Sequence, residues 1–210
     1  MIVEPTDLAL LTAWRNGDGA AGELLFVRHF RALYRFFETK FSAEADELVQ
    51  ATFLACVRAK ERFHEGSSFR AYLFTVARHE LYRVVEERQR ARGRIDFGVS
   101  SVAELVPTPG TRLDVRHERV RLLEALRALP VDVQMLLELH YWQEVGIREL
   151  AAIFDAQEVT IRSRLHRARA ALREVMAAQP ETASRIGETL EDFDAWARSL
   201  ADRPSAQIAA

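Results

Sequence analysis

The chain has 210 residues, of which 49% are hydrophobic and 29% are charged, and its formal net charge is −2. This composition excludes a disordered polar tail and predicts one or two globular domains. Glycine and proline are scarce, whereas Ala, Leu, Arg and Glu, which favour helix, are abundant, so we expect an all-α fold. No apolar run approaches the roughly 20 residues that span a bilayer. The N-terminus lacks the features of a secretory signal, so we expect a cytoplasmic protein without membrane insertion.

The sequence pattern lacks the groups that carry enzyme chemistry. Cys56 is the only cysteine and cannot form an internal disulfide. The histidines are scattered, and none has a cysteine or carboxylate at metal-ligand spacing. We find no nucleophile elbow, phosphate-binding glycine loop or dinucleotide motif. The sequence therefore predicts no catalytic residue, no metal and no cofactor, and a protein that is not an enzyme.

A first domain with four helices is predicted over residues 1–92. The first helix starts at Thr6 and ends at the turn 16–19. The second carries an apolar stripe formed by Phe26, Phe30, Leu33, Phe37 and Phe41. The third is capped by Ser42 and turns inward Leu48, Val49, Phe53, Cys56 and Val57. The fourth follows the loop 64–68, ends near Arg92, and buries Phe69, Leu73, Val76, Leu81 and Val85.

A second domain is predicted over residues 113–179, after a flexible linker, 93–112, that contains glycine, serine and proline without a sustained period. Its first helix carries Val120, Leu123 and Leu126, and Pro130 suits the first turn of the next. Two helices follow Gly146 and are separated only by 155–158, the loop length of a helix-turn-helix. Their apolar stripes are formed by Ile147, Leu150, Ala151 and Phe154, and by Ile161, Leu165, Ala168 and Leu172.

Arginine is concentrated in two segments, 88–94 and 162–173. Two local basic surfaces on a nearly neutral chain indicate DNA binding that depends on a larger partner. The helix that begins near Glu158 turns its apolar residues to the core, so its polar face presents Arg162, Ser163, His166, Arg169 and Arg173. Such a face can enter a major groove, where Arg donates two hydrogen bonds to guanine. On periodicity alone, a solvated basic helix is an equal alternative.

Two residues near the start of that helix have more specific roles. Glu158 suits the positive end of the helix dipole, although it can also accept a hydrogen bond from a cytosine amino group. Asp155 lies in the turn, where glycine would adopt the left-handed conformation most easily. Aspartate tolerates that conformation better than most residues, so the turn is compatible with the sequence.

A second nucleic-acid surface is expected on the fourth helix of the first domain. There, basic and aromatic side chains alternate: Arg70, Tyr72, Phe74, Arg78, His79, Tyr82 and Arg83. Aromatic rings stack on unpaired bases, and arginines follow the backbone. The alternative places Tyr72 and Phe74 in the core, and this alternative is favoured for Phe74.

The C-terminal extension, 180–210, contains a predicted amphipathic helix over 182–202. Its apolar positions are Ile186, Leu190, Phe193, Ala197 and Leu200, and acidic residues outnumber basic ones around them. One hypothesis is that this helix docks on the second domain and modulates access to its basic face. The alternative is a helix that extends the core or frays in solvent.

Three strings in the same order give the chain a resemblance to a known family. They are DELVQATFL (46–54), SFRAYLFTVAR (68–78) and RSRLHRAR (162–169). Together they resemble the extracytoplasmic-function sigma factors of bacterial RNA polymerase, and the resemblance covers residues 6 to about 177. It implies two helical domains similar to sigma regions 2 and 4. It also implies a protein that directs core polymerase to promoters through recognition of the −35 element and opening of the −10 element.

The resemblance also implies partners and roles for individual residues. The partners are core polymerase, through its β′ clamp helices and β flap, promoter DNA, and an anti-sigma factor or other regulator. Polymerase binding is implied for Asp46, Glu47 and Gln50. Contacts to the −10 element are implied for Arg70, Tyr72, Arg78, His79 and Arg83. Contacts to the −35 element are implied for Glu158, Thr160, Arg162, Ser163, His166, Arg167 and Arg169.

The chain departs from the family pattern at three places. Ala51 replaces the usual glutamate of the clamp-binding motif, so affinity for the clamp is expected to depend more on Asp46. His79 stands where asparagine is common near the pocket for a flipped −10 base. Residues 155–157 replace the usual Gly-x-Pro-like turn.

An autonomous helix-turn-helix regulator is the main alternative. Such a regulator binds tightly by itself to a two-fold symmetric site. A sigma factor binds weakly alone and recognises a directional −35/−10 pair together with polymerase. A helical interaction module, such as a sigma antagonist, is a third class, but it would not need the arginines of 162–173 in a base-reading arrangement.

Overall fold

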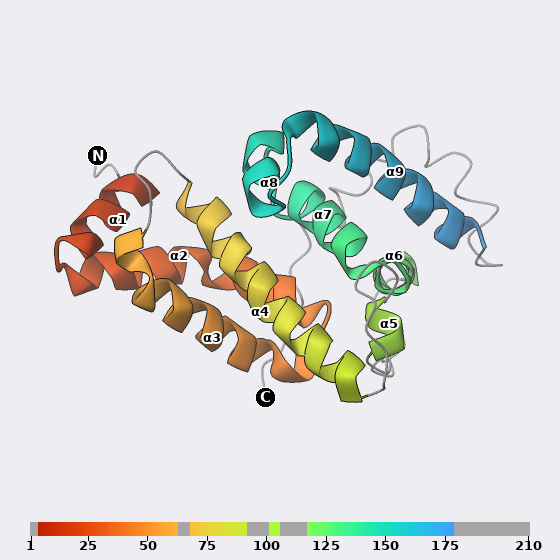
Figure 1. The fold of residues 1–210 in the computed structure, drawn as a ribbon, viewed down its shortest axis with the longest axis horizontal. Coiled ribbons are helices and arrows are strands. Elements are labelled where there is room, and N and C mark those ends of the chain that lie inside the picture. Colours follow the sequence, from red (N-terminus) through yellow and green to blue (C-terminus); the bar gives the residue numbers. More distant parts are fainter. Residues whose placement is uncertain (1–3, 63–67, 92–100, 106–116, 179–210) are drawn as a thin grey trace. The chain divides into compact units, whose positions relative to one another are not determined.

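The computed structural model describes residues 4–62, 68–91, 101–105 and 117–178 (Figure 1). These residues form α-helices and two 3₁₀ turns, with a single isolated β-bridge and no strand, as the composition predicts. They group into two compact units. The first contains α1 (Asp7–Arg15), α2 (Gly19–Glu38), α3 (Ala45–Arg58), α4 (Phe69–Ala91) and α8 (Ile147–Ile153). The second contains α5 (Val102–Leu105), α6 (His117–Ala128), α7 (Val131–Tyr141) and, from Ile161 onward, most of α9 (Glu158–Ala177).

Side-chain caps fix the starts of the first two helices. Thr6 accepts a hydrogen bond from the backbone N–H of Ala9 at 3.2 Å, which confirms the predicted start of α1. Asp18 caps α2 in the same way through Ala21 N at 3.1 Å. Farther along, the Ser68 hydroxyl accepts from Ala71 N at 3.3 Å at the start of α4. In each case a short polar side chain satisfies a backbone donor that the helix itself leaves unpaired.

An ion-pair cluster joins α1 to α2. The Asp7 carboxylate lies 2.6 Å from Arg28 Nη1 and 2.6 Å from Nε2 of the buried His29. Burial raises the pKa of Asp7, but its hydrogen bonds to Arg28 and His29 and their charges outweigh burial, so the pKa is lowered overall. His29 thereby takes a core position that hydrophobic periodicity does not reveal.

The core of the first unit is dominated by aromatic and aliphatic residues of α2, α3 and α4. Its largest fully buried hydrophobic side chains are Leu25, Leu33, Phe36, Phe37, Phe41, Leu73, Phe74 and Leu81. Phe36 and Phe74 meet edge to face with ring centroids 5.6 Å apart, which joins α2 to α4. Phe74 is therefore a core residue, as its alternative assignment predicted.

Two apolar positions predicted to face inward are exposed instead. Phe30 is 46% exposed and Val57 is 42% exposed. The inward stripe of α2 runs through Leu25, His29 and Leu33, so Phe30, which follows His29 by one residue, is rotated about 100° away from it. The predicted Ser42 cap is also wrong, because a 3₁₀ turn, Ser42–Glu44, separates Ser42 from α3.

A close contact between α1 and α2 depends on the absence of a side chain at Gly22. A Cβ added there would lie 2.6 Å from Nε1 of Trp14, whose ring is buried. We expect Gly22→Ala to lower the free energy of unfolding by about 1–3 kcal/mol, since the Trp14 ring must shift within a packed core. Gly19→Ala is the matched control on the same helix, because no atom lies within 4 Å of its added Cβ. Chemical denaturation measures both, and equal midpoints for the two variants would contradict this packing.

The second unit has its own core, formed by α6, α7 and α9. Its buried members are Leu122, Ala125, Leu126, Leu129, Leu137, Tyr141, Ala168, Leu172 and Met176. Leu122 is buried and Leu123 is only half-buried, which corrects the predicted inward position of Leu123. Pro130 stands at the N-cap of α7, one residue before the predicted place, where its missing N–H costs no helical hydrogen bond.

Part of the segment predicted as a flexible linker is ordered. Within 93–112, α5 packs against α6, and Val102 is fully buried. Ser101 forms an isolated antiparallel bridge with Pro130. The short helix α5 is therefore part of the second unit. It is too short to show a periodic pattern, and the serine and glycine content of the segment obscured it in the sequence. None of the described helices is long and apolar enough to cross a membrane.

Candidate nucleic-acid interface

Helix α9 presents an exposed polar face opposite its buried stripe. Ile161, Leu165 and Leu172 are buried, whereas Arg162, Ser163, His166 and Arg167 are exposed. The chain thus has the one-sided helix that the sequence predicted, with cationic and hydrogen-bonding side chains turned to solvent. Thr160 is half-buried and Glu158 is exposed at the first position of the helix.

The Arg169 side chain is held by contacts within the second unit. Its Nε donates a hydrogen bond to the Tyr141 hydroxyl, and its guanidinium lies 5.7 Å from the centre of the Tyr141 ring. Tyr141 comes from α7 and is 3% exposed. Sequence reasoning missed this partner because the two residues are far apart in the chain. Arg173, which was also predicted on the polar face, is half-buried.

The turn before α9 has the left-handed residue that the sequence allowed. Asp155 has a φ of 48°, and the backbone N–H of Ala156 donates to the Ala151 carbonyl at 2.9 Å. This bond satisfies a carbonyl at the end of α8 and closes the turn. Aspartate therefore occupies the place where glycine is easiest, and α9 starts three residues later.

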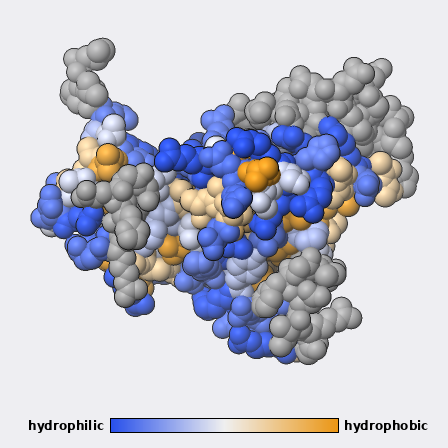
Figure 2. Space-filling view, turned by 45° about the horizontal axis from the view of Figure 1, so that its top comes forward, coloured by the Kyte–Doolittle hydropathy of each residue, from blue (hydrophilic) through white to orange (hydrophobic). Residues whose placement is uncertain are grey.

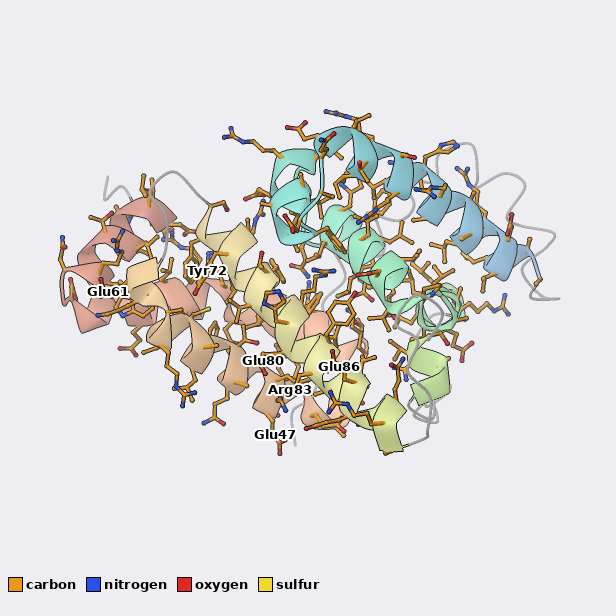
Figure 3. The ribbon with its side chains drawn as sticks, viewed as in Figure 1. Glu47, Glu61, Tyr72, Glu80, Arg83 and Glu86 are labelled. Atoms are coloured by element: carbon orange, nitrogen blue, oxygen red, sulfur yellow. The ribbon has the colours of Figure 1, made fainter. Side chains whose placement is uncertain are left out.

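Helix α4 carries part of the predicted base-stacking surface on one face. Tyr72, His79 and Arg83 fall within about 40° of one another around the helix axis. His79 and Arg83 are exposed and Tyr72 is half-buried. Figure 3 shows Tyr72 and Arg83 spaced along α4, together with Glu80 and Glu86.

Carboxylates that sequence reasoning missed surround Arg83. Its Nε lies 3.1 Å from Glu80, and its Nη1 lies 3.7 Å from Glu87. The signal was available in the sequence, because residues three and four apart on a helix are neighbours. These carboxylates hold the Arg83 guanidinium along α4 and offset part of its charge.

Arg70 and Arg78 lie on a different side of α4 and contact α8. Arg70 Nη2 lies 2.6 Å from Oε2 of Glu149. The Arg78 guanidinium lies 4.9 Å from the Tyr82 ring centre and 5.2 Å from that of Phe154. The structure thus brings together only Tyr72, His79 and Arg83 of the five residues predicted for this surface.

The basic run 88–94 does not form an open cationic surface where it is described. Arg88 pairs with Glu44 and lies 4.5 Å from the Phe41 ring centre. Arg90 lies 2.8 Å from Glu86. Since both charges have acidic partners, they do not support the predicted DNA role, and Arg92 and Arg94 lie outside the described residues.

The acidic end of α3 is exposed, as a partner-binding role requires. Asp46, Glu47 and Gln50 are all exposed. Burial raises the pKa of Tyr34 on α2, and the carboxylates of Glu38 and Asp46 raise it further, which places the phenol near this acidic end. Tyr34 also stacks on Phe30, with ring centroids 6.0 Å apart.

An apolar groove lies in the first unit beside these aromatic residues. It is lined by Trp14, Phe26, Val27, Phe30 and Phe53. Phe26 and Phe53 stack with centroids 4.6 Å apart, and Val27 is 67% exposed. Elsewhere, Figure 2 shows hydrophilic residues over much of the visible surface, with hydrophobic residues in smaller areas. Phe30, wrongly predicted as core, is part of this groove.

The described residues contain no cluster of metal-binding side chains. Cys56 is fully buried, and burial raises the pKa of its thiol to about 12, so it is not a nucleophile near neutral pH. The predicted amphipathic helix over 182–202 lies outside the described residues.

Comparisons with known proteins match both halves of the chain. The family model for sigma-70 region 2 matches residues 25–91, and the model for sigma-70 region 4 matches residues 119–172. The ECF RNA polymerase sigma-E factors of Salmonella typhimurium and of Escherichia coli K12 are each 26% identical over 176 residues. The match covers 80% of this chain and 92% of each relative.

Solved structures show the same likeness. The sigma factor RpoE from Bartonella quintana, in complex with the anti-sigma factor NepR, is 26% identical with a TM-score of 0.57. That match covers 75% of this chain and 97% of RpoE. CnrH, in complex with the cytosolic domain of CnrY, has a TM-score of 0.63 at 23% identity, covers 82% of this chain, and shares its fold.

Proposed function

Because the chain belongs to the extracytoplasmic-function sigma factors and so directs RNA polymerase to promoters, we propose that three of its surfaces divide this task. The face of α9 binds the −35 element, a face of α4 binds the opened −10 element, and α3 binds the polymerase. The exposed basic face of α9, directly after a closed turn, is the observation that supports this division most strongly.

On α9, Arg162, Ser163 and His166 are proposed to contact base edges in the major groove. Arginine suits guanine there, while serine and histidine form adaptable hydrogen bonds. Arg167 and Thr160 lie on one flank of the face and are assigned to phosphates. Arg169 is proposed to contact DNA from its position on Tyr141, which limits its freedom and lowers the entropy lost on binding. Glu158 is proposed to stabilise the helix start.

On α4, Tyr72 and His79 are proposed to hold unpaired bases of the −10 element. Tyr72 offers a ring for stacking, and His79 can donate, accept or stack. Arg83 is held between carboxylates and is proposed to contact a base through its remaining donors. Arg70 and Arg78 are available to DNA only when they leave their contacts with α8.

On α3, the polymerase contact is proposed to involve Asp46, Glu47 and Gln50, which are exposed on the helix whose Phe53 lines the apolar groove. The proposed partner elements are the β′ clamp helices, with the β flap contacting the second unit. Charge complementarity at such an interface controls association rate and partner choice.

The test of the polymerase contact is the double variant Asp46→Arg with Glu47→Arg. We expect its affinity for core polymerase to fall by roughly tenfold or more, because two attractive charges become repulsive. Glu61→Arg is the control, since Glu61 is exposed on the separate 3₁₀ turn Lys60–Arg62 (Figure 3). Equilibrium binding to immobilised core polymerase measures all three proteins. Equal loss in the double variant and in the control would contradict the assignment to α3.

The remaining assignments follow from this role. Recognition and strand opening belong to the chain, whereas nucleotide addition belongs to the polymerase, so the chain itself is proposed to catalyse no reaction. We place it in the cytoplasm with its DNA and polymerase. An anti-sigma factor is a proposed further partner, as for the Bartonella quintana relative. The segment 182–202 is proposed to modulate access to α9, and its deletion with promoter assays tests this.

A further inference from the structure

We infer that Val159 on α9 contacts the C5 methyl group of a thymine in the −35 element, and so helps to determine which promoters the chain recognises. The inference rests on the proposed −35 role of α9, and it adds an apolar contact to a face for which only polar contacts have been assigned. Its observation is separate from that proposal. Val159 is 65% exposed, on a helix whose other large hydrophobic side chains are buried or half-buried.

The exposure of Val159 is not explained by the packing of the described residues. Every other exposed large hydrophobic side chain among them lies on α1, α2 or α3. Valine is also a weak choice for the first turn of a helix, because its branched Cβ restricts χ1 and it carries no charge that interacts with the helix dipole. Val159 therefore adds little to the stability of α9, and what it offers is an apolar surface to another molecule.

Helix geometry places Val159 at the centre of the exposed polar face of α9. Because α9 is one continuous helix, each residue is rotated by about 100° from the one before it. Arg162, Ser163 and His166 then lie within about 60° of Val159, on both sides of it. The buried Ile161 lies on the opposite side of the helix. An apolar side chain thus lies among the three polar ones that are proposed to contact base edges.

The major groove contains one group that is complementary to such a side chain. The valine side chain has no donor and no acceptor, so it forms no hydrogen bond with a phosphate or with a base edge. The base pairs present donors and acceptors in the major groove, and thymine adds its C5 methyl group, which apolar side chains contact. Contact between the valine methyl groups and this methyl group removes both from water. Thymine is therefore the base that Val159 favours.

Replacement of thymine by deoxyuridine tests the contact, because deoxyuridine lacks only the C5 methyl group and keeps the O4 acceptor of thymine. A promoter obtained by run-off transcription supplies the −35 element, and each thymine of either strand is replaced in turn. Initiation is measured with core polymerase and the full-length chain. At one thymine, we expect initiation to fall roughly 3- to 5-fold on the deoxyuridine template, the effect of one methyl group that is no longer buried.

Val159→Ala removes the protein side of the same contact. We expect this variant to initiate equally on thymine and deoxyuridine at that position, because no apolar partner for the methyl group remains. Its unfolding midpoint should stay the same or rise slightly, since the side chain is exposed and alanine has the higher helix propensity. Val27→Ala is the matched control. It makes the same change at a valine that is 67% exposed on α2, and should keep the thymine preference of the wild-type chain.

The outcomes separate this inference from the proposed function. Equal initiation by the wild-type chain on thymine and deoxyuridine templates at every position of the −35 element would overturn the inference. A thymine preference that persists unchanged in Val159→Ala would overturn it as well. Both results leave the proposed function intact, provided that Arg162→Ala still lowers initiation in a sequence-dependent way. Absence of initiation by the wild-type chain on any promoter would contradict the proposed function and the inference together.

Discussion

Replacement of Arg162 by alanine is expected to reduce initiation at promoters with a −35 element by roughly 5- to 150-fold, the effect of losing about 1–3 kcal/mol of base recognition. Arg162 is exposed near the start of α9, where a recognition helix contacts base edges. The loss should be largest at promoters that carry guanine at the contacted position, and smaller where another base already stands there. Run-off transcription on promoters that differ only at that base pair measures this dependence.

Arg164→Ala is the matched control for this experiment. Arg164 is also exposed, but it lies about 160° away from Arg162 around the helix. The control removes the same charge from the same helix and should change initiation only slightly and equally for all −35 sequences. If Arg162→Ala and Arg164→Ala lowered initiation equally at every sequence, α9 would supply general attraction only, and its assigned base-reading role would be wrong.

Replacement of Tyr72 by alanine is expected to impair promoter opening by roughly 5- to 150-fold, because a stacked base loses about 1–3 kcal/mol of contact energy. Closed-complex formation should change little, since Tyr72 lies on α4 and the −35 contact is assigned to α9. A fluorescent base analogue placed in the −10 element reports opening separately from binding. Tyr72→Phe keeps the ring and should retain most of the activity.

Two results would contradict the Tyr72 assignment. Equal defects in Tyr72→Ala and Tyr72→Phe would indicate that the hydroxyl, and not the ring, carries the effect. If a lower unfolding midpoint accounted for the whole loss of activity in Tyr72→Ala, the half-buried ring would be a core residue. That is the alternative that the sequence left open.

Features that depend on neighbouring residues in the chain could be predicted from the sequence. The Thr6 cap, the turn at Asp155 and the two-sided pattern of α9 each follow from a few adjacent positions. A helix of 3.6 residues per turn converts such local patterns into faces, so the exposure of Arg162, Ser163 and His166 was predictable. The three strings that carry the family resemblance are also runs of adjacent residues, so they too could be recognised from the sequence.

Features that depend on packing between distant segments could not be predicted. Phe30 has the spacing of a core residue, yet α2 turns His29 inward because Asp7 from α1 supplies its polar partner. Arg70 pairs with Glu149, Arg78 lies over the Phe154 ring, and Arg169 contacts Tyr141. The two members of each pair are far apart in the sequence, so no periodic pattern links them. The basic-aromatic surface of α4 was therefore predicted as one set, although the fold divides it between two sides.

The autonomous-regulator alternative accounts less well for these features. A regulator of that class needs a two-fold arrangement of recognition helices on a symmetric site. This chain instead matches two different regions of one family, and it exposes acidic residues at the start of α3 in addition to the basic face of α9. The two classes differ most in what the isolated chain does with DNA.

Run-off transcription by purified core polymerase on a pool of genomic fragments, with and without the full-length chain, tests the central claim most directly. The account predicts new transcripts that require the chain and begin at a fixed distance downstream of a directional −35/−10 pair, together with weak DNA binding by the chain alone. An unchanged transcript pattern, accompanied by tight binding of the isolated chain to a two-fold symmetric sequence, would contradict it.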